Sequence, residues 1–122
     1  MSRMLVGLVI FALEAAGGAE ASQSGLDLLR ACEGRAGTNE LATKVGEIYC
    51  AGYVAGFVDA YQLVAGVPAS QTAVCLPAGG LENEQYMLVV GKWLREHPND
   101  LHKTARVSVF LALKEAFPCR GR

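Results

Sequence analysis

The sequence predicts a small all-α domain of four to five helices, stapled by disulfide bonds. Apolar residues recur three or four positions apart in several segments, and no segment alternates convincingly between apolar and polar residues. A chain of 122 residues makes one small domain at most, and a hydrophobic fraction of 52% is enough to build a core. The third observation is an even number of cysteines, four, in so short a chain.

The first 21 residues differ from the rest and have the layout of a secretory signal peptide. A basic start precedes the uncharged apolar run Leu5–Leu13, and Ala19-Glu20-Ala21 fits an A-x-A cleavage site. Such a run spans about 14 Å as a helix, whereas a bilayer needs roughly 20 apolar residues. We therefore expect residues 1–21 to be a signal peptide, cleaved near Ala21. Residues 22–122 would then be exported without a stable membrane anchor.

The charge balance argues against a nucleic-acid partner. The net charge is -1, whereas a protein that binds nucleic acid is expected to carry a basic excess. Without residues 1–21, basic and acidic side chains balance. Any partner would therefore be held by local features of the surface and not by a global field.

All four cysteines lie in the expected mature domain, and we predict two disulfides from them. The chain has no C-x-x-C pair and no haem signature, and both histidines are far from every cysteine in sequence. We therefore expect no metal site and no cofactor. The four residues are Cys32, Cys50, Cys75 and Cys119.

The first two helices are expected at 25–33 and 44–65, on either side of a glycine-rich connection. Leu26 and Leu29 have helical spacing in the first, and Thr38 or Asn39 is suited to cap the second. The segment Ile48–Val58 is free of charge, which favours a central helix that is buried nearly all round.

Small and aromatic residues form two neighbouring stripes on this second helix. Gly52 and Gly56 belong to the small stripe, and a glycine inside a helix costs about 1 kcal/mol relative to alanine. We expect close approach of another helix to offset that cost. Asp59 follows the charge-free run, and we expect it to make a structural polar contact, since a buried carboxylate needs a partner. The aromatic stripe is interpreted as packing and comprises Tyr49, Tyr53, Phe57 and Tyr61.

Two further helices are expected at 82–97 and 101–117, on either side of a proline turn. Pro98 ends the first of them, because the residue before a proline is disfavoured in the α region. Asn99 or Asp100 is suited to cap the second.

Four cysteines allow three pairings, and the sequence alone does not choose among them. We favour Cys32–Cys50 and Cys75–Cys119. The first pair is local, because a short connection joins the first two helices. The second pair follows helix ends that can meet at one pole of the bundle.

No constellation of residues for catalysis stands out. The chain has no G-x-S-x-G, H-E-x-x-H, Walker or G-x-G-x-x-G motif. His97 and His102, with Glu96 and Asp100, imitate an acid-base or metal cluster, but we interpret them as a polar turn between helices. The residues thus predict a non-enzymatic binding protein without naming its partner.

Five segments, in order, resemble one known family. The segments are Gly25–Cys32, Cys50–Ala60 with its C-x-G-Y-V-x-G-x-x-D pattern, Cys75-Leu76-Pro77, Trp93–Pro98 and Phe117-Pro118-Cys119. Together they resemble the Tai (type VI amidase immunity), or resistance-associated-protein, family over residues 25–119.

The resemblance implies a periplasmic, all-helical immunity-type domain over residues 22–122, homodimeric and without enzymatic activity. Such a protein binds a type VI secretion peptidoglycan amidase and occludes its active-site cleft. The turn at 96–100 is our candidate for the partner-binding loop, and its residues are Glu96, His97, Pro98, Asn99 and Asp100. The alternatives are a periplasmic acid-stress chaperone, which would lose structure at low pH, and another non-enzymatic helical binding protein.

Overall fold

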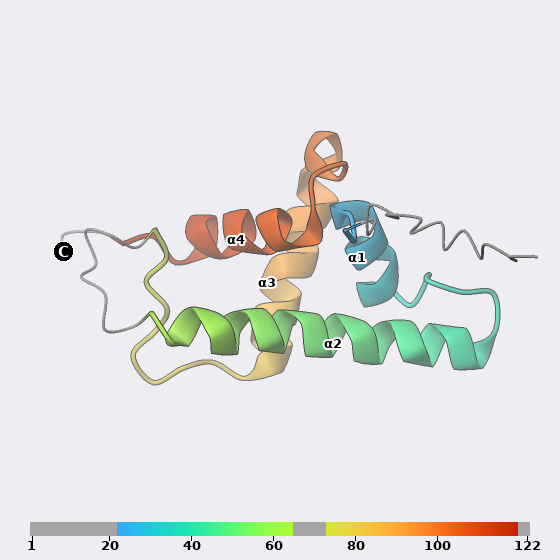
Figure 1. Cartoon of the computed structure of the whole chain (residues 1–122), viewed down its shortest axis with the longest axis horizontal. Coiled ribbons are helices and arrows are strands. Elements are labelled where there is room, and N and C mark those ends of the chain that lie inside the picture. Colours follow the sequence, from blue (N-terminus) through green and yellow to red (C-terminus); the bar gives the residue numbers. More distant parts are fainter. Residues whose placement is uncertain (1–21, 65–72, 120–122) are drawn as a thin grey trace, which may run out of the picture.

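A computed structural model describes residues 22–64 and 73–119, and these residues form an all-α domain (Figure 1). The expected signal peptide lies outside the described residues. Within them there are no named strands and two isolated β-bridges. The elements are α1 (Gly25–Cys32), α2 (Glu40–Gln62), α3 (Asn83–Glu96), the short 3-10 helix η2 (Pro98–Asp100) and α4 (Ala105–Ala116). The predicted fold class is confirmed.

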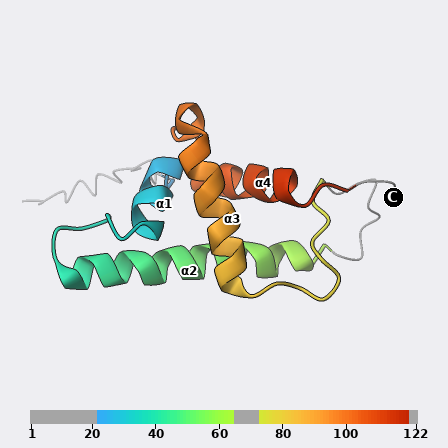
Figure 2. The same cartoon turned by 180° about the vertical axis from the view of Figure 1, so that it is seen from behind.

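The four helices share one core. α2 and α4 run in the same direction and α3 crosses both, while α1 lies beside the N-terminal half of α2 (Figures 1 and 2). Side chains from all four helices meet in the centre, and the largest fully buried apolar ones are Tyr86, Leu28, Leu94, Leu113, Val54, Val90 and Val109.

α1 begins where the sequence predicts, because Ser24 and Asp27 form a capping box. The Asp27 backbone N–H donates to the Ser24 hydroxyl at 3.1 Å, and the Ser24 backbone N–H donates to the Asp27 carboxylate at 3.0 Å. The hydrogen bonds from Ser24 lower the pKa of Asp27.

α2 starts at Glu40, four residues before the expected position. The Asn39 side chain accepts a hydrogen bond from the Ala42 backbone N–H at 2.8 Å, and this cap extends the helix toward its N-terminus. The end expected near residue 65 lies beside residues that are not described.

The prediction that α2 is buried nearly all round is wrong. The helix buries one face, through Gly46, Cys50, Val54 and Val58. Its opposite face is exposed, although that face is also apolar. The charge-free run makes both faces of the helix apolar, but the other three helices cover only one of them. The aromatic stripe does pack against the core, and all four rings are partly buried.

α4 starts at Ala105 and not at residue 101, so the predicted cap at Asn99 or Asp100 is also wrong. Residues 98–100 form η2 instead, and Thr104 takes the N-cap position. The residues between η2 and α4 do not form a helix, because their backbone pairs with the start of α1. The Leu101 and Lys103 carbonyls accept hydrogen bonds from α1 at 3.0 and 2.8 Å.

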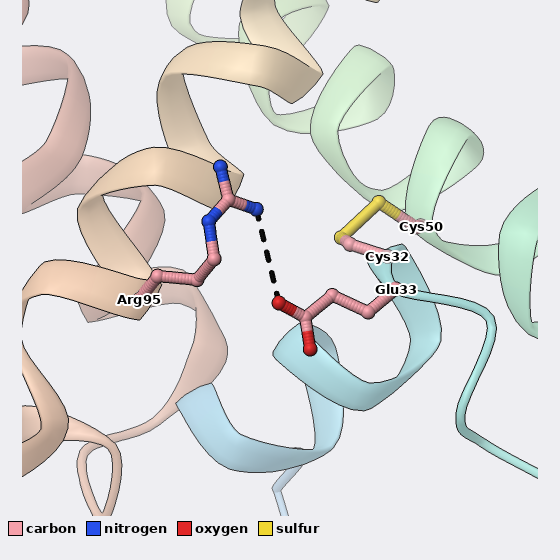
Figure 3. The surroundings of a disulfide bond; sticks show 4 residues. All are labelled: Cys32, Glu33, Cys50 and Arg95. Carbon is pink, nitrogen blue, oxygen red and sulfur yellow. Dashed lines mark ion pairs between the residues drawn. A yellow bond between two sulfur atoms is a disulfide. The ribbon is translucent and has the colours of Figure 1, made fainter.

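Both favoured disulfides are present. Cys32–Cys50 joins the end of α1 to α2, and Cys75–Cys119 joins the loop before α3 to the segment after α4. A backbone hydrogen bond of 2.8 Å from Cys75 N–H to the Phe117 carbonyl accompanies the second bridge. Beside the first bridge, Arg95 of α3 lies 3.8 Å from Glu33, which ties α3 to the end of α1 (Figure 3).

Candidate functional site

The turn between α3 and α4 stands out from the body of the molecule. α3 continues past α1 and α4, and the turn caps its far end (Figure 1). We call residues 96–104 the α3–α4 turn. It contains all five residues predicted to bind a partner.

A stacked pair of rings fixes the start of the turn. The rings of Trp93 and His97 lie with centroids 4.2 Å apart and planes 13° from parallel. His97 Nδ1 is 2.7 Å from the Trp93 carbonyl oxygen. Because two separate contacts hold the same imidazole, its orientation at the end of α3 is set by the helix.

Glu115 of α4 holds this pair from the other side. Trp93 Nε1 donates a hydrogen bond to Glu115 Oε2 at 2.9 Å, and His97 Nε2 lies 3.8 Å from the same oxygen. The Trp93 side chain is buried, so its N–H needs an acceptor, and Glu115 supplies it. The carboxylate therefore joins the base of the turn to α4.

The end of the turn is held by backbone hydrogen bonds to α1. Gly25 N–H donates to the Lys103 carbonyl at 2.8 Å, and Ala105 N–H donates to the Gln23 carbonyl at 2.6 Å. Gly25 has little free space, since a Cβ there would lie 2.7 Å from Ser108 Oγ. The start of α1 thus lies tightly against the turn and supports it.

An ion pair closes the turn itself. Lys103 Nζ lies 2.7 Å from Asp100 Oδ1, and the Asp100 N–H donates to the His97 carbonyl at 3.0 Å. The hydrogen bond from Lys103 lowers the pKa of Asp100, and the positive charges of Lys103, His97 and His102 add to the effect. Asp100 therefore stabilises the turn from within, and its carboxylate is less available to a partner.

Four side chains of the turn are exposed to solvent, whereas Leu101 packs against the core and the Thr104 hydroxyl is buried. Glu96, Pro98, Asn99 and His102 are exposed, so the turn presents an acid, an amide, an imidazole and a rigid ring on a braced frame. No group of three or more His, Cys, Asp or Glu side chains suited to a metal ion occurs in the described residues. None of the described helices is long and apolar enough to cross a membrane.

The other residues singled out in the sequence lie away from this turn. Gly52, Gly56 and Asp59 are all on the exposed face of α2. A Cβ on either glycine would meet nothing within 4 Å, so the helix expected to approach them is absent among the described residues. Asp59 is exposed and not a buried carboxylate in need of a partner.

A scan against protein families gives the decisive comparison. A model described as Rap1a immunity proteins matches residues 24–119. This chain belongs to the Rap1a immunity protein family. The match spans the four helices, both disulfides and the whole α3–α4 turn. A search of curated proteins found no match.

Rap1a immunity proteins are immunity proteins of type VI secretion, and an immunity protein binds a cognate effector. The expected partner of this chain is therefore such an effector. The predicted resemblance is confirmed at this level. The family suggests a non-enzymatic inhibitor, and the disulfides fit an exported protein.

Sequence reasoning missed the parts of this Rap1a protein that support the turn. The sequence assigned no role to Glu115 or Gln23, and Gly25 was only the first residue of an expected helix. Local patterns carry no signal for their role, because they are 18 to 82 residues away from the groups that they hold. The extension of the turn to His102 and Lys103 was hidden by the helix start predicted at residue 101.

Proposed function

We propose that this chain is a periplasmic immunity protein that binds a type VI secretion peptidoglycan amidase and blocks its active-site cleft. The α3–α4 turn is the element that enters the cleft. The chain acts by occupying space in its partner and carries no catalytic residue of its own.

The observation that carries the proposal is a protruding turn with a rigid base. A cleft-blocking loop must keep its shape when bound, because each side chain ordered on binding costs about 0.5–1.5 kcal/mol. The α3–α4 turn is ordered beforehand by the Trp93–His97 stack, the Asp100–Lys103 ion pair and the hydrogen bonds to α1. Little further ordering is then needed when it meets its partner.

The location in the periplasm rests on the N-terminal pattern and on the disulfides. Disulfides persist in an oxidising compartment, and no described cysteine is free. Peptidoglycan is also located there, so inhibitor and amidase would meet in the same compartment. We further propose that the chain is a homodimer, as the resemblance implies.

The test is protection of cells from a type VI amidase that is directed to the periplasm. Co-expression of the full chain should prevent lysis, and the two proteins should elute together on gel filtration. Asn99→Arg adds bulk and charge at the exposed tip, and it should abolish protection. Ala78→Arg places the same side chain on another exposed loop and serves as the matched control.

Two results would contradict the proposal in different ways. If the wild-type chain protects cells against none of the tested type VI amidases, an amidase is not the partner. If it protects and Asn99→Arg protects equally well, the partner is correct but the turn does not enter the cleft. The circular dichroism spectra of both variants must match that of the wild type, which excludes misfolding as the cause.

A further inference from the structure

α2 presents a long apolar face that nothing in the described chain covers. In Figure 1 no other helix passes in front of α2, whereas α3 crosses it in the view from behind (Figure 2). The large side chains on this face are highly exposed: Leu41 at 75%, Val45 at 57%, Ile48 at 68% and Leu63 at 87%. We define the α2 outer face as Leu41, Val45, Ile48, Gly52, Gly56, Asp59 and Leu63, which are spaced three or four residues apart.

The two glycines of this face have no explanation within the described chain. A glycine in a helix interior costs about 1 kcal/mol relative to alanine, and both positions have open space for a Cβ. A large side chain from another molecule would fit over them. The exposed leucines, valine and isoleucine support the same conclusion, because contiguous apolar patches on soluble proteins usually mark contact surfaces.

The α2 outer face is complementary to a second copy of itself. Gly52 lies at its centre, and two identical helices that run in opposite directions about this point place residues of matching distance opposite one another. Ile48 lies four residues before Gly52 and Gly56 lies four residues after it. A bulky side chain of one copy therefore meets a glycine of the other.

The ends of the face obey the same relation. Leu41 and Leu63 both lie eleven residues from Gly52, so each leucine faces the other leucine of the second copy. The helix rises about 1.5 Å per residue, which makes the contact about 33 Å long.

Charge complementarity supports the antiparallel arrangement. Lys44, at the edge of the face, lies eight residues before Gly52, and Asp59 lies seven residues after it. Each copy would thus place its Lys44 beside the Asp59 of the other. In a parallel arrangement Asp59 would face Asp59, and like charges so close are unfavourable. Within one chain Lys44 pairs with Glu47 at 3.2 Å, at an exposed site where such a pair is worth little.

We propose that the α2 outer face is the contact between two copies of this chain, antiparallel and centred on Gly52. This deepens the homodimer of the proposed function and rests on that part of it alone. The arrangement leaves the α3–α4 turn free, because the turn and α2 lie at opposite edges of the molecule (Figure 1). Each copy in the dimer therefore keeps its turn available for a partner.

Sedimentation of the purified protein, expressed as the full chain, tests the contact without any amidase. The wild type should sediment as a dimer. Ile48→Lys should raise the dissociation constant by about 100-fold or more, since a two-fold contact contains the change twice. Leu88→Lys is the matched control: Leu88 is 62% exposed on α3, and its replacement should leave the dimer unchanged.

Charge reversal and cross-linking test the direction and the centre of the contact. Lys44→Asp alone and Asp59→Lys alone should each weaken the dimer, and the double reversal should restore it. Gly52→Cys should form a disulfide with its own copy on oxidation. Leu41→Cys should do so only together with Leu63→Cys, because position 41 faces position 63 and not itself.

Three results would overturn the inference. One is a wild-type protein that stays monomeric at a concentration of several hundred micromolar. Another is a dimer that Ile48→Lys leaves intact, which indicates a different contact, or a dimer in which Leu41→Cys alone cross-links, which indicates a parallel one. The third is loss of amidase protection by Ile48→Lys without change in the association state, which assigns the face to the effector. Because association is measured without an amidase, failure here leaves the inhibitory function standing.

Discussion

Two glycines six residues apart in α2 should respond to alanine in opposite ways. Gly46 and Gly52 both lie inside the helix, and the sequence gives no reason to treat them differently. The structure does. A Cβ on Gly46 would lie 2.9 Å from the Ala36 Cβ, whereas a Cβ on Gly52 would meet nothing within 4 Å.

The expected magnitudes follow from two terms. Alanine improves helix propensity by about 1 kcal/mol at either position, so Gly52→Ala should stabilise the folded chain by about that amount. In Gly46→Ala the same gain is opposed by overpacking against Ala36, which costs about 1–3 kcal/mol. The propensity terms cancel in the comparison, so Gly52→Ala should be more stable than Gly46→Ala by about 1–3 kcal/mol.

Urea unfolding followed by circular dichroism measures this difference. The series is run at several protein concentrations, and the low-concentration limit is used, because Gly52 also lies at the proposed contact between copies. For a domain of about 100 residues, a change of 1 kcal/mol moves the melting temperature by about 4–8 °C, which thermal unfolding resolves.

The reasoning is refuted if the two variants are equally stable in that limit, or if Gly46→Ala is the more stable. Either result would mean that the connection at residues 34–39 moves away from a Cβ at position 46 without a cost in stability. A destabilised Gly52→Ala would show that the outer face of α2 is covered within the monomer.

Three further predictions concern buried or capped polar groups. Ser108 Oγ is buried without a hydrogen-bond partner among the described residues, so Ser108→Ala should raise the free energy of unfolding by about 1 kcal/mol, and a clear loss would contradict this. Glu115→Ala leaves the Trp93 N–H without its acceptor and should cost about 1–3 kcal/mol, whereas Glu115→Gln keeps an acceptor oxygen and should cost less; equal losses in urea unfolding would argue against the hydrogen bond. The lowered pKa of Asp27 means that the folded state binds this proton less well than the unfolded state, so its contribution is present above about pH 4 and disappears as the pH falls through the lowered value. Asp27→Asn should therefore lose less stability than the wild type on acidification, and identical pH profiles would count against the capping box.

The helices were predictable because their signals are local. Spacing of apolar residues located all four, and Ser24, Asn39 and Pro98 mark boundaries through hydrogen bonds or steric limits that act within a few residues. The start of α4 was not predictable. It depends on hydrogen bonds to α1, whose residues lie about eighty positions earlier.

The residues of the candidate site were also predictable only where their signals are local. The turn could be found from its histidines and its proline, since they stand together in the sequence. Its bracing by Glu115 and by the start of α1 could not, because those contacts join segments that only folding brings together.

The sequence by itself determined an all-helical domain and its approximate helices, because these rest on short-range patterns. It also favoured one of the three cysteine pairings from the positions of helix ends, and the fold then brought those cysteines together. Only the tertiary structure decided which face of α2 is buried. Composition makes both faces apolar, and burial depends on where α1, α3 and α4 lie. That difference leaves Ile48 exposed and Val54 fully buried on one helix, and it separates the core of the monomer from the surface proposed for a second copy.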